Sequence, residues 1–180
     1  MAVLRNFSIK FVDIMIGVVL GVGFQWWPDL KEVWQYLAFL FVYLNLIDYW
    51  IDYSPTIKKF PLKRELDVIL HTFIIFSMFF LIFNTSNSLS AFLLAFVLYR
   101  ILDIVWIWRM KTVYRASAYD KKFLNSWGLQ DIYEVAFTLL LLLAFWMWKG
   151  QPLYYLLIFI ALRVLTRIMA SLRYKKIYYS

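Results

Sequence analysis

Residues 99–109 read YRILDIVWIWR, which places Arg100 and Asp103 inside a run of Ile, Leu, Val and Trp. A charged side chain that faces lipid alone costs about 2.5–3.5 kcal/mol on insertion scales. If this segment crosses a membrane, both charges therefore need partners within the protein. The rest of the chain has to show whether lipid is the solvent and which groups could be those partners.

The composition of the chain favours lipid as the solvent. Of its 180 residues, 64% are hydrophobic and 22% are aromatic, and a soluble domain of this length cannot bury so much apolar surface. Six apolar stretches approach the ~20 residues that cross a bilayer core. They are 11–27, 33–52, 65–84, 89–109, 129–148 and 152–172. The sequence predicts an all-α, polytopic membrane protein whose residues 1–180 form a single transmembrane domain.

Short polar turns predict how the six spans pair. Turns near Pro28, at 84–88 and at 150–152 are too short for anything but antiparallel neighbours. The spans are therefore expected to form three helical hairpins, 11–52, 65–109 and 129–172. The longer connection at 110–128 is interpreted either as a segment in the membrane interface or as a solvated loop.

The three hairpins also align with one another. Asp13, Asp67 and Asp131 open the odd spans, in the contexts FVDIM, ELDVI and LQDIY. We interpret the match as a possible threefold internal repeat of one hairpin. The alternative is that bilayer thickness forces every hairpin to a similar length.

Basic residues lie mostly in alternate loops, and the net charge is +8. One set of loops holds Arg5, Lys10, Lys58, Lys59, Lys63, Arg64, Arg109, Lys111, Arg115, Lys121, Lys122, Arg173, Lys175 and Lys176, and the other only Lys31 and Lys149. The positive-inside rule then predicts that both termini are cytoplasmic. We expect a multi-pass protein of the plasma (inner) membrane rather than of an organelle. Its basic loops favour anionic lipid headgroups, or a cytoplasmic protein partner, over nucleic acid.

Polar residues within the spans fall at one depth near the cytoplasmic side when the hairpins are aligned. This layer consists of Asp13, Asn45, Asp48, Asp67, His71, Arg100, Asp103, Asp131, Glu134, Arg163 and Arg167. Arg100 is expected to pair with Asp67 or Asp103. Asp131 or Glu134 is expected to pair with Arg163 or Arg167. Such a layer either marks an ion pathway or only fixes helix rotation and register.

The first span carries a narrow stripe in which Asp13, Gly17, Gly21 and Gln25 recur four residues apart. Residues at this spacing share one face of a helix. In one interpretation the stripe lines a permeation path, with Asp13 concentrating cations at its inner mouth. In the other, Gly17 and Gly21 form a GxxxG face against which a second helix packs closely.

The first span also resembles a known family. The stretch Phe11-Val12-Asp13 resembles the Phe-Ser-Asp motif in the first helix of the lysosomal and prokaryotic six-helix potassium channels. The resemblance implies six-helix units that assemble around a pore lined by this helix. Val12 stands at the motif's serine, and Phe7 stands at the position of its arginine.

Catalytic chemistry finds little support in the sequence. His71 is the only histidine, and it lies one turn beyond Asp67. We expect a polar group satisfied by its neighbours, because a catalytic histidine needs a second reactive partner in a polar cleft. No catalytic, metal-binding or cofactor-binding motif is recognised, so no enzymatic activity and no cofactor are predicted.

The function predicted from the sequence is that of a membrane channel or transporter for cations, assembled as a homo-oligomer. The alternative is a non-conducting membrane scaffold or accessory subunit. Such a protein would dock a cytoplasmic partner or anionic lipid through its basic loops.

Overall fold

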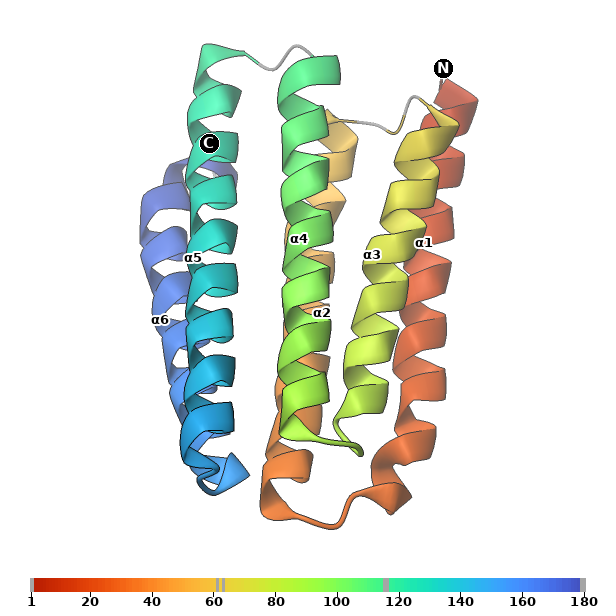
Figure 1. Ribbon diagram of the computed structural model, residues 1–180. Coiled ribbons are helices and arrows are strands. Elements are labelled where there is room, and N and C mark those ends of the chain that lie inside the picture. Colours follow the sequence, from red (N-terminus) through yellow and green to blue (C-terminus); the bar gives the residue numbers. More distant parts are fainter. Residues whose placement is uncertain (1, 61, 63, 115–116, 179–180) are drawn as a thin grey trace. The chain divides into compact units, whose positions relative to one another are not determined.

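The computed structural model describes residues 2–60, 62, 64–114 and 117–178, with most of their side chains. These residues form six α-helices and one short 3-10 helix (Figure 1). The elements are α1 (Ala2–Gly23), η1 (Phe24–Asp29), α2 (Val33–Lys59), α3 (Glu65–Asn84), α4 (Leu89–Val113), α5 (Ala118–Trp148) and α6 (Pro152–Tyr178). The described residues contain no strand, so the predicted all-α class is confirmed.

Five helical segments of the described chain are long and apolar enough to cross a membrane. They are Lys10–Asp29, Glu65–Asn84, Leu89–Val113, Asp120–Trp148 and Pro152–Met169. Helix α2 is not among them, although it has 27 residues. Its apolar sequence is interrupted by Gln35, Asn45 and Asp48. The span expected at 33–52 is therefore less apolar than the other five.

The helices extend further than the sequence predicts at two connections. Helix α4 runs to Val113 and α5 begins at Ala118, so the connection expected at 110–128 shrinks to residues 114–117. Ser117 caps α5, because its hydroxyl accepts a hydrogen bond of 3.2 Å from the backbone N–H of Asp120. Helix α2 likewise continues past Pro55 to Lys59. The prediction of a long connection at 110–128 is wrong, since a capped helix takes up most of it.

The chain forms two compact units, which we describe separately. Unit 1 is Met1–Tyr99 and contains α1, η1, α2, α3 and the start of α4. Unit 2 is Arg100–Ser180 and contains the rest of α4 together with α5 and α6. The boundary falls within α4, and therefore within the hairpin predicted at 65–109.

In unit 1, helix α1 packs against α2 and α3. Its buried face carries Val12, Ile16 and Val19, at helical spacing. The closest approach is at Gly23, where an added Cβ would lie 2.6 Å from Tyr43 Oη and 3.0 Å from Ile82 Cδ1. A larger residue at position 23 would therefore require Tyr43 or Ile82 to shift.

Side chains also fasten the turns of unit 1 to its helices. The ring of Trp26 in η1 lies edge-on to Phe79 and Phe83 of α3, with centroids 4.9 and 5.5 Å away. Gln35 Nε2, in the first turn of α2, donates a hydrogen bond of 3.1 Å to the carbonyl oxygen of Ser86. These contacts hold the two turns against the ends of α2 and α3.

In unit 2, α5 and α6 pack side by side and run antiparallel (Figure 1). Lys149 ends α5 in the left-handed conformation, with φ of 45°. Its N–H donates a hydrogen bond of 2.9 Å to the carbonyl oxygen of Phe145. Pro152 then begins α6, as proline commonly does at a first helical position. This turn lies where the sequence predicts one.

The three aspartates of the predicted repeat do not occupy equivalent positions. Asp67 lies in the first turn of α3, whereas Asp13 and Asp131 lie well inside α1 and α5. Asp13 is exposed, while Asp67 and Asp131 are buried. The threefold repeat therefore has no counterpart in the environments of these three residues.

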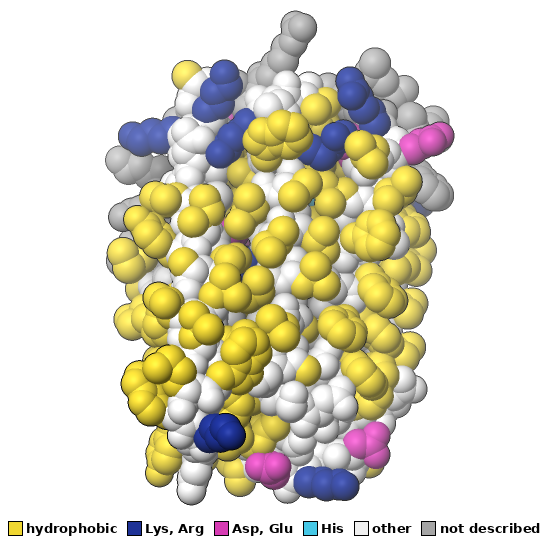
Figure 2. Space-filling model, viewed as in Figure 1, with side chains coloured by type: hydrophobic (Ala, Val, Ile, Leu, Met, Phe, Trp, Pro, Cys, Tyr) yellow, Lys and Arg dark blue, Asp and Glu magenta, His cyan; other side chains and the backbone are white. Residues whose placement is uncertain are grey.

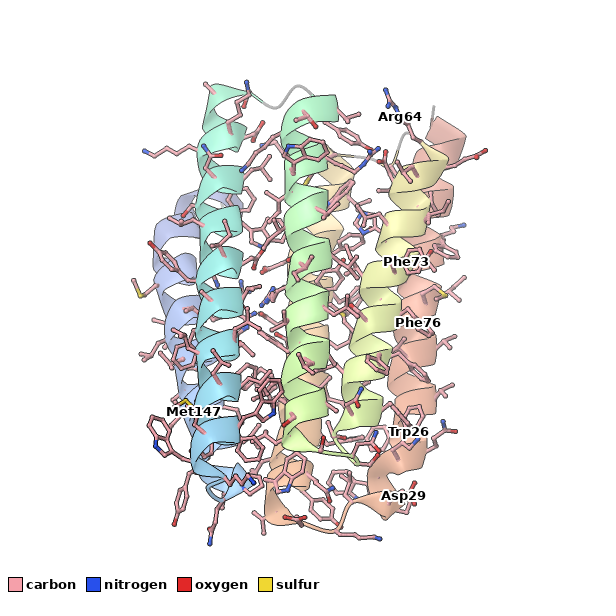
Figure 3. The ribbon with its side chains drawn as sticks, in the orientation of Figure 1. Trp26, Asp29, Arg64, Phe73, Phe76 and Met147 are labelled. Atoms are coloured by element: carbon pink, nitrogen blue, oxygen red, sulfur yellow. The ribbon has the colours of Figure 1, made fainter. Side chains whose placement is uncertain are left out.

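Large apolar side chains remain on the surface along the helices, as Figure 2 shows for one face. On α3, Phe73 and Phe76 are 57% and 59% exposed, and Met147 near the end of α5 is 74% exposed (Figure 3). The other side of α3 is buried, with Ile74 and Met78 at 0% and 1%. A helix that is apolar on both its inner and its outer face is typical of a membrane span.

Lys and Arg side chains gather near the helix ends on the face that Figure 2 shows. Several residues of the predicted basic loops have side chains outside the described part of the chain. They are Arg5, Lys58, Lys63, Arg115, Arg173, Lys175 and Lys176, and the side chain of Phe7 lies outside it as well.

Candidate functional site: a buried ionic cluster and an exposed polar stripe

Unit 2 holds a cluster of five charged side chains, which we call the ionic cluster. Helix α4 contributes Arg100 and Asp103, α5 contributes Asp131 and Glu134, and α6 contributes Arg163. The pairs on α4 and α5 are three residues apart, a spacing that places both side chains on one helix face. These positions lie near the middle of the three helices, and not near one end as the predicted layer does.

Arg100 is the centre of the ionic cluster and contacts all three carboxylates. Its Nη1 lies 3.4 Å from Asp103 Oδ2 and 3.2 Å from Asp131 Oδ1. Its Nε lies 2.6 Å from Glu134 Oε2. The guanidinium side chain is only 4% exposed, so these ion pairs form away from water. Removing one partner of such a buried pair typically costs 3–5 kcal/mol.

Glu134 joins Arg100 to helix α6. Its Oε1 lies 3.1 Å from Arg163 Nη1 and accepts a hydrogen bond of 2.8 Å from the hydroxyl of Thr166. The same oxygen accepts a third bond, of 3.2 Å, from Gln130 Nε2. One carboxylate therefore links side chains from all three helices of unit 2.

The pairings of Arg100 with Asp103 and of Arg163 with Glu134 are among those the sequence predicts. The contacts of Arg100 with Asp131 and Glu134 were not predicted. Sequence reasoning missed the neutral partners of Glu134. These partners are Gln130 and Thr166. Gln130 lies four residues before Glu134 on the same helix face, and this spacing was the signal that could have found it.

Asp67 and His71 belong to unit 1, where both are buried at the start of α3. Asp67 Oδ2 accepts a hydrogen bond of 3.3 Å from the backbone N–H of Arg64, so this carboxylate caps the helix. The ring of His71 lies edge-on to Tyr53 of α2, with centroids 4.8 Å apart. Tyr53 in turn stacks on Tyr49 at 5.1 Å. These residues therefore form a packed aromatic contact between α2 and α3.

The stripe on α1 consists of Asp13, Gly17, Gly21 and Gln25, and we call it the α1 stripe. All four residues are exposed. A Cβ added at Gly17 or Gly21 would meet no atom within 4 Å. Asp13 Oδ1 accepts a hydrogen bond of 2.9 Å from Trp50 Nε1 of α2, and Trp50 is itself 46% exposed. Within unit 1, no helix of the described residues packs closely against Gly17 and Gly21.

The remaining predicted residues lie apart from these two features. Asn45 on α2 is buried, and Asp48 one turn further is half-buried. Arg167 on α6 is also half-buried. Over the part of the chain that the structure describes, no group of three or more His, Asp or Glu side chains is arranged to hold a metal ion.

No family model matches the chain, and comparisons with curated proteins and with solved structures give no match either. The interpretation therefore depends on the geometry alone. The ionic cluster is buried and its ion pairs join α4, α5 and α6, which suits a role inside unit 2. The α1 stripe is polar, small and uncovered, and suits contact with something outside the chain.

Proposed function

We propose that this chain is a multi-pass membrane protein that assembles as a homo-oligomer and conducts cations along a path lined by α1. The observation that carries the proposal is the exposure of the α1 stripe. The proposal combines three steps, which concern the membrane, the assembly and the path.

Membrane insertion is supported by the five spanning-length helices and by their exposed apolar side chains. In water, the row of exposed residues on α3 that includes Phe73 and Phe76 would favour aggregation. In lipid, the same row faces acyl chains. We further propose that both termini are cytoplasmic and that the basic helix ends contact anionic headgroups of the plasma (inner) membrane.

Assembly is supported by the position of Asp13 within the first spanning segment, Lys10–Asp29. A carboxylate that faces lipid is costly, so intramembrane carboxylates almost always face a protein interior or a water-filled cavity. Within the described residues of unit 1, Asp13 is exposed and accepts a hydrogen bond from the half-exposed Trp50. A ring of copies would turn Asp13 away from lipid and toward a shared axis.

The path itself is supported by the chemistry of the α1 stripe. Gly17 and Gly21 leave backbone and open space instead of bulky side chains. A ring of Asp13 carboxylates at one end would attract cations and repel anions. In the potassium channel family that the first span resembles, this helix lines the pore. Val12, which departs from the family's motif, is 1% exposed and so does not alter the exposed face.

Ion flux from liposomes tests conduction directly. Purified protein in vesicles should release potassium or sodium along a gradient, and Asp13→Asn should lower the flux at least several-fold, because the attracting charges are lost. Glu65→Gln is the matched control, since Glu65 is an exposed carboxylate in the first turn of α3. Vesicles that stay silent, or equal flux from the wild type and Asp13→Asn, contradict the proposal.

Oligomeric state tests the assembly separately. Gly17→Leu with Gly21→Leu should fold normally, because no described atom lies within 4 Å of a Cβ added at either position. The added side chains should narrow the path at the shared axis and lower the flux, while native mass spectrometry in mild detergent should still detect the ring. Val18→Leu, at an exposed position beside the stripe, is the control. A wild-type protein that is monomeric in native nanodiscs contradicts the shared axis.

The alternative function is a non-conducting scaffold or accessory subunit. The ion pairs within the ionic cluster favour this alternative, because charges that pair with one another fix helix packing without touching a solute. Silent vesicles, together with binding of the protein to anionic liposomes or to a cytoplasmic protein, would favour this alternative over conduction.

A further inference from the structure

The ionic cluster contains more carboxylates than the cations that act on them. The ion pairs of the cluster join three carboxylates, those of Asp103, Asp131 and Glu134, to two guanidinium groups, those of Arg100 and Arg163. With every group ionised, three negative charges would face two positive ones. Both aspartate side chains are 1% exposed, so water cannot screen the excess negative charge.

The uncompensated negative charge falls on Asp103 and Asp131, because Glu134 contacts both guanidinium groups. Glu134 contacts both Arg100 Nε and Arg163 Nη1, at 2.6 and 3.1 Å. Asp103 and Asp131 instead share a single nitrogen, Arg100 Nη1, at 3.4 and 3.2 Å. No N–H or O–H donor of the described residues makes a hydrogen bond to Asp103 Oδ1 or to either oxygen of Asp131.

Because Asp103 and Asp131 both approach the same nitrogen, Arg100 Nη1, their carboxyl groups lie next to each other. Two ionised carboxylates have no hydrogen to share, whereas a carboxyl group and a carboxylate form a strong hydrogen bond. One proton would therefore supply the missing donor and bring the charge of the cluster to zero.

We propose that Asp103 and Asp131 hold one proton between them, which makes the ionic cluster of unit 2 a site for a single buried proton. Arg100 positions both carboxyl groups through Nη1. Glu134 remains ionised between the two guanidinium groups. The site lies wholly within unit 2 and does not depend on conduction along α1.

Infrared spectroscopy tests this proton directly. An isolated aspartate has a pKa of about 3.9 and is ionised at pH 7. Protein labelled with ¹³C-aspartate should nevertheless show the C=O stretch of a protonated carboxyl group at pH 7, and this band should shift when H₂O is replaced by D₂O. Asp103→Asn and Asp131→Asn should each abolish the band.

Both variants should fold, because either one leaves two carboxylates to face two guanidinium groups. Asp13→Asn is the control and should keep the band, since Asp13 is exposed on α1. Melting temperatures of the variants close to that of the wild type would exclude unfolding as the reason for a lost band.

Two outcomes overturn the proposal. One is a wild-type spectrum without a protonated carboxyl band. The other is a band that persists in both Asp103→Asn and Asp131→Asn. A wild type that has no band but is stabilised by added sodium, in a manner that Asp103→Asn removes, would show that a metal cation balances the cluster instead.

Discussion

The ionic cluster of unit 2 and the α1 stripe of unit 1 carry their charge in opposite ways. Arg100 in the cluster is only 4% exposed on its side chain and contacts three carboxylates. Asp13 in the stripe is exposed and, among the described residues, accepts a hydrogen bond from Trp50. The cluster buries its charges against one another, whereas the stripe leaves its charge for the surroundings.

This contrast separates stability from interaction. A buried pair that loses one partner leaves an uncompensated charge, so the cluster should be sensitive to substitutions that remove one of its cations. The glycines of the stripe should tolerate larger side chains, because no described atom lies within 4 Å of a Cβ added at Gly17 or Gly21. Loss of a cation from the cluster should therefore lower the melting temperature, and substitutions in the stripe should change flux.

The largest effect is expected from Arg100→Leu. The substitution removes the guanidinium that faces Asp103, Asp131 and Glu134, so unfolding should become easier by at least about 3–5 kcal/mol. The melting temperature in detergent should fall sharply, and expression should fall with it. Lys121→Leu, at an exposed position on α5, should melt like the wild type. Equal melting of both variants would show that the cluster does not hold unit 2 together.

The second largest effect is expected from Gly23→Ala on α1, and Gly21→Ala on the same helix is its control. Gly23→Ala brings a Cβ to 2.6 Å from Tyr43 Oη, and such overpacking typically costs about 1–3 kcal/mol. Gly21→Ala, two residues earlier, meets nothing within 4 Å and should leave stability unchanged or slightly raised, since alanine favours the helix. Chemical unfolding in mixed micelles measures both variants.

A second substitution identifies the cause of the Gly23 effect. Tyr43→Phe removes the hydroxyl that clashes with the new Cβ, although it also removes a 2.8 Å hydrogen bond to the carbonyl oxygen of Leu20. Gly23→Ala should therefore cost less in the Tyr43→Phe background than in the wild type. An equal cost in both backgrounds would assign the strain to Ile82 instead.

The third effect concerns a neutral partner of the ionic cluster. Thr166→Val keeps the shape of the side chain but removes the hydroxyl that donates a hydrogen bond of 2.8 Å to Glu134 Oε1. Leaving a buried charged acceptor short of one donor should cost about 1–3 kcal/mol. Thr112→Val on α4 is the control, because that hydroxyl is exposed and bonds only to backbone carbonyl oxygens. A similar loss in both variants would mean that the bond to Glu134 adds nothing.

The sequence predicts the partners within a helix turn better than the limits of the helices. Arg100 and Asp103 are three residues apart on one helix, so the cost of burying an unpaired charge already points to their pairing. Asp13, Gly17 and Gly21 share a face for the same geometric reason. Both features follow from local spacing, which the sequence contains.

Two other features were not predicted, one of which depends on long-range contacts and the other on a local helix cap. The glycine that packs closely is Gly23, although Gly17 and Gly21 have the recognised GxxxG spacing. The difference is made by Tyr43 and Ile82, which come from other helices. The end of α4 and the start of α5 were also misjudged, because the cap formed by Ser117 outweighs the polar composition of 110–128.

The smallest effect is expected from Trp50→Phe, which removes the one hydrogen-bond donor to Asp13 among the described residues and keeps an aromatic ring. Because Trp50 is 46% exposed and Asp13 is exposed, the loss in stability of the monomer should stay below about 1 kcal/mol. The free energy of unfolding, measured in a detergent in which the protein stays monomeric, gives this loss. In an assembled ring the same substitution should reduce stability more. The Asp13–Trp50 hydrogen bond of each copy would then lie beside a neighbouring copy and away from lipid. A loss in the monomer as large as that of Thr166→Val would mean that the α1 stripe is already covered, and the contrast between the two regions would fail.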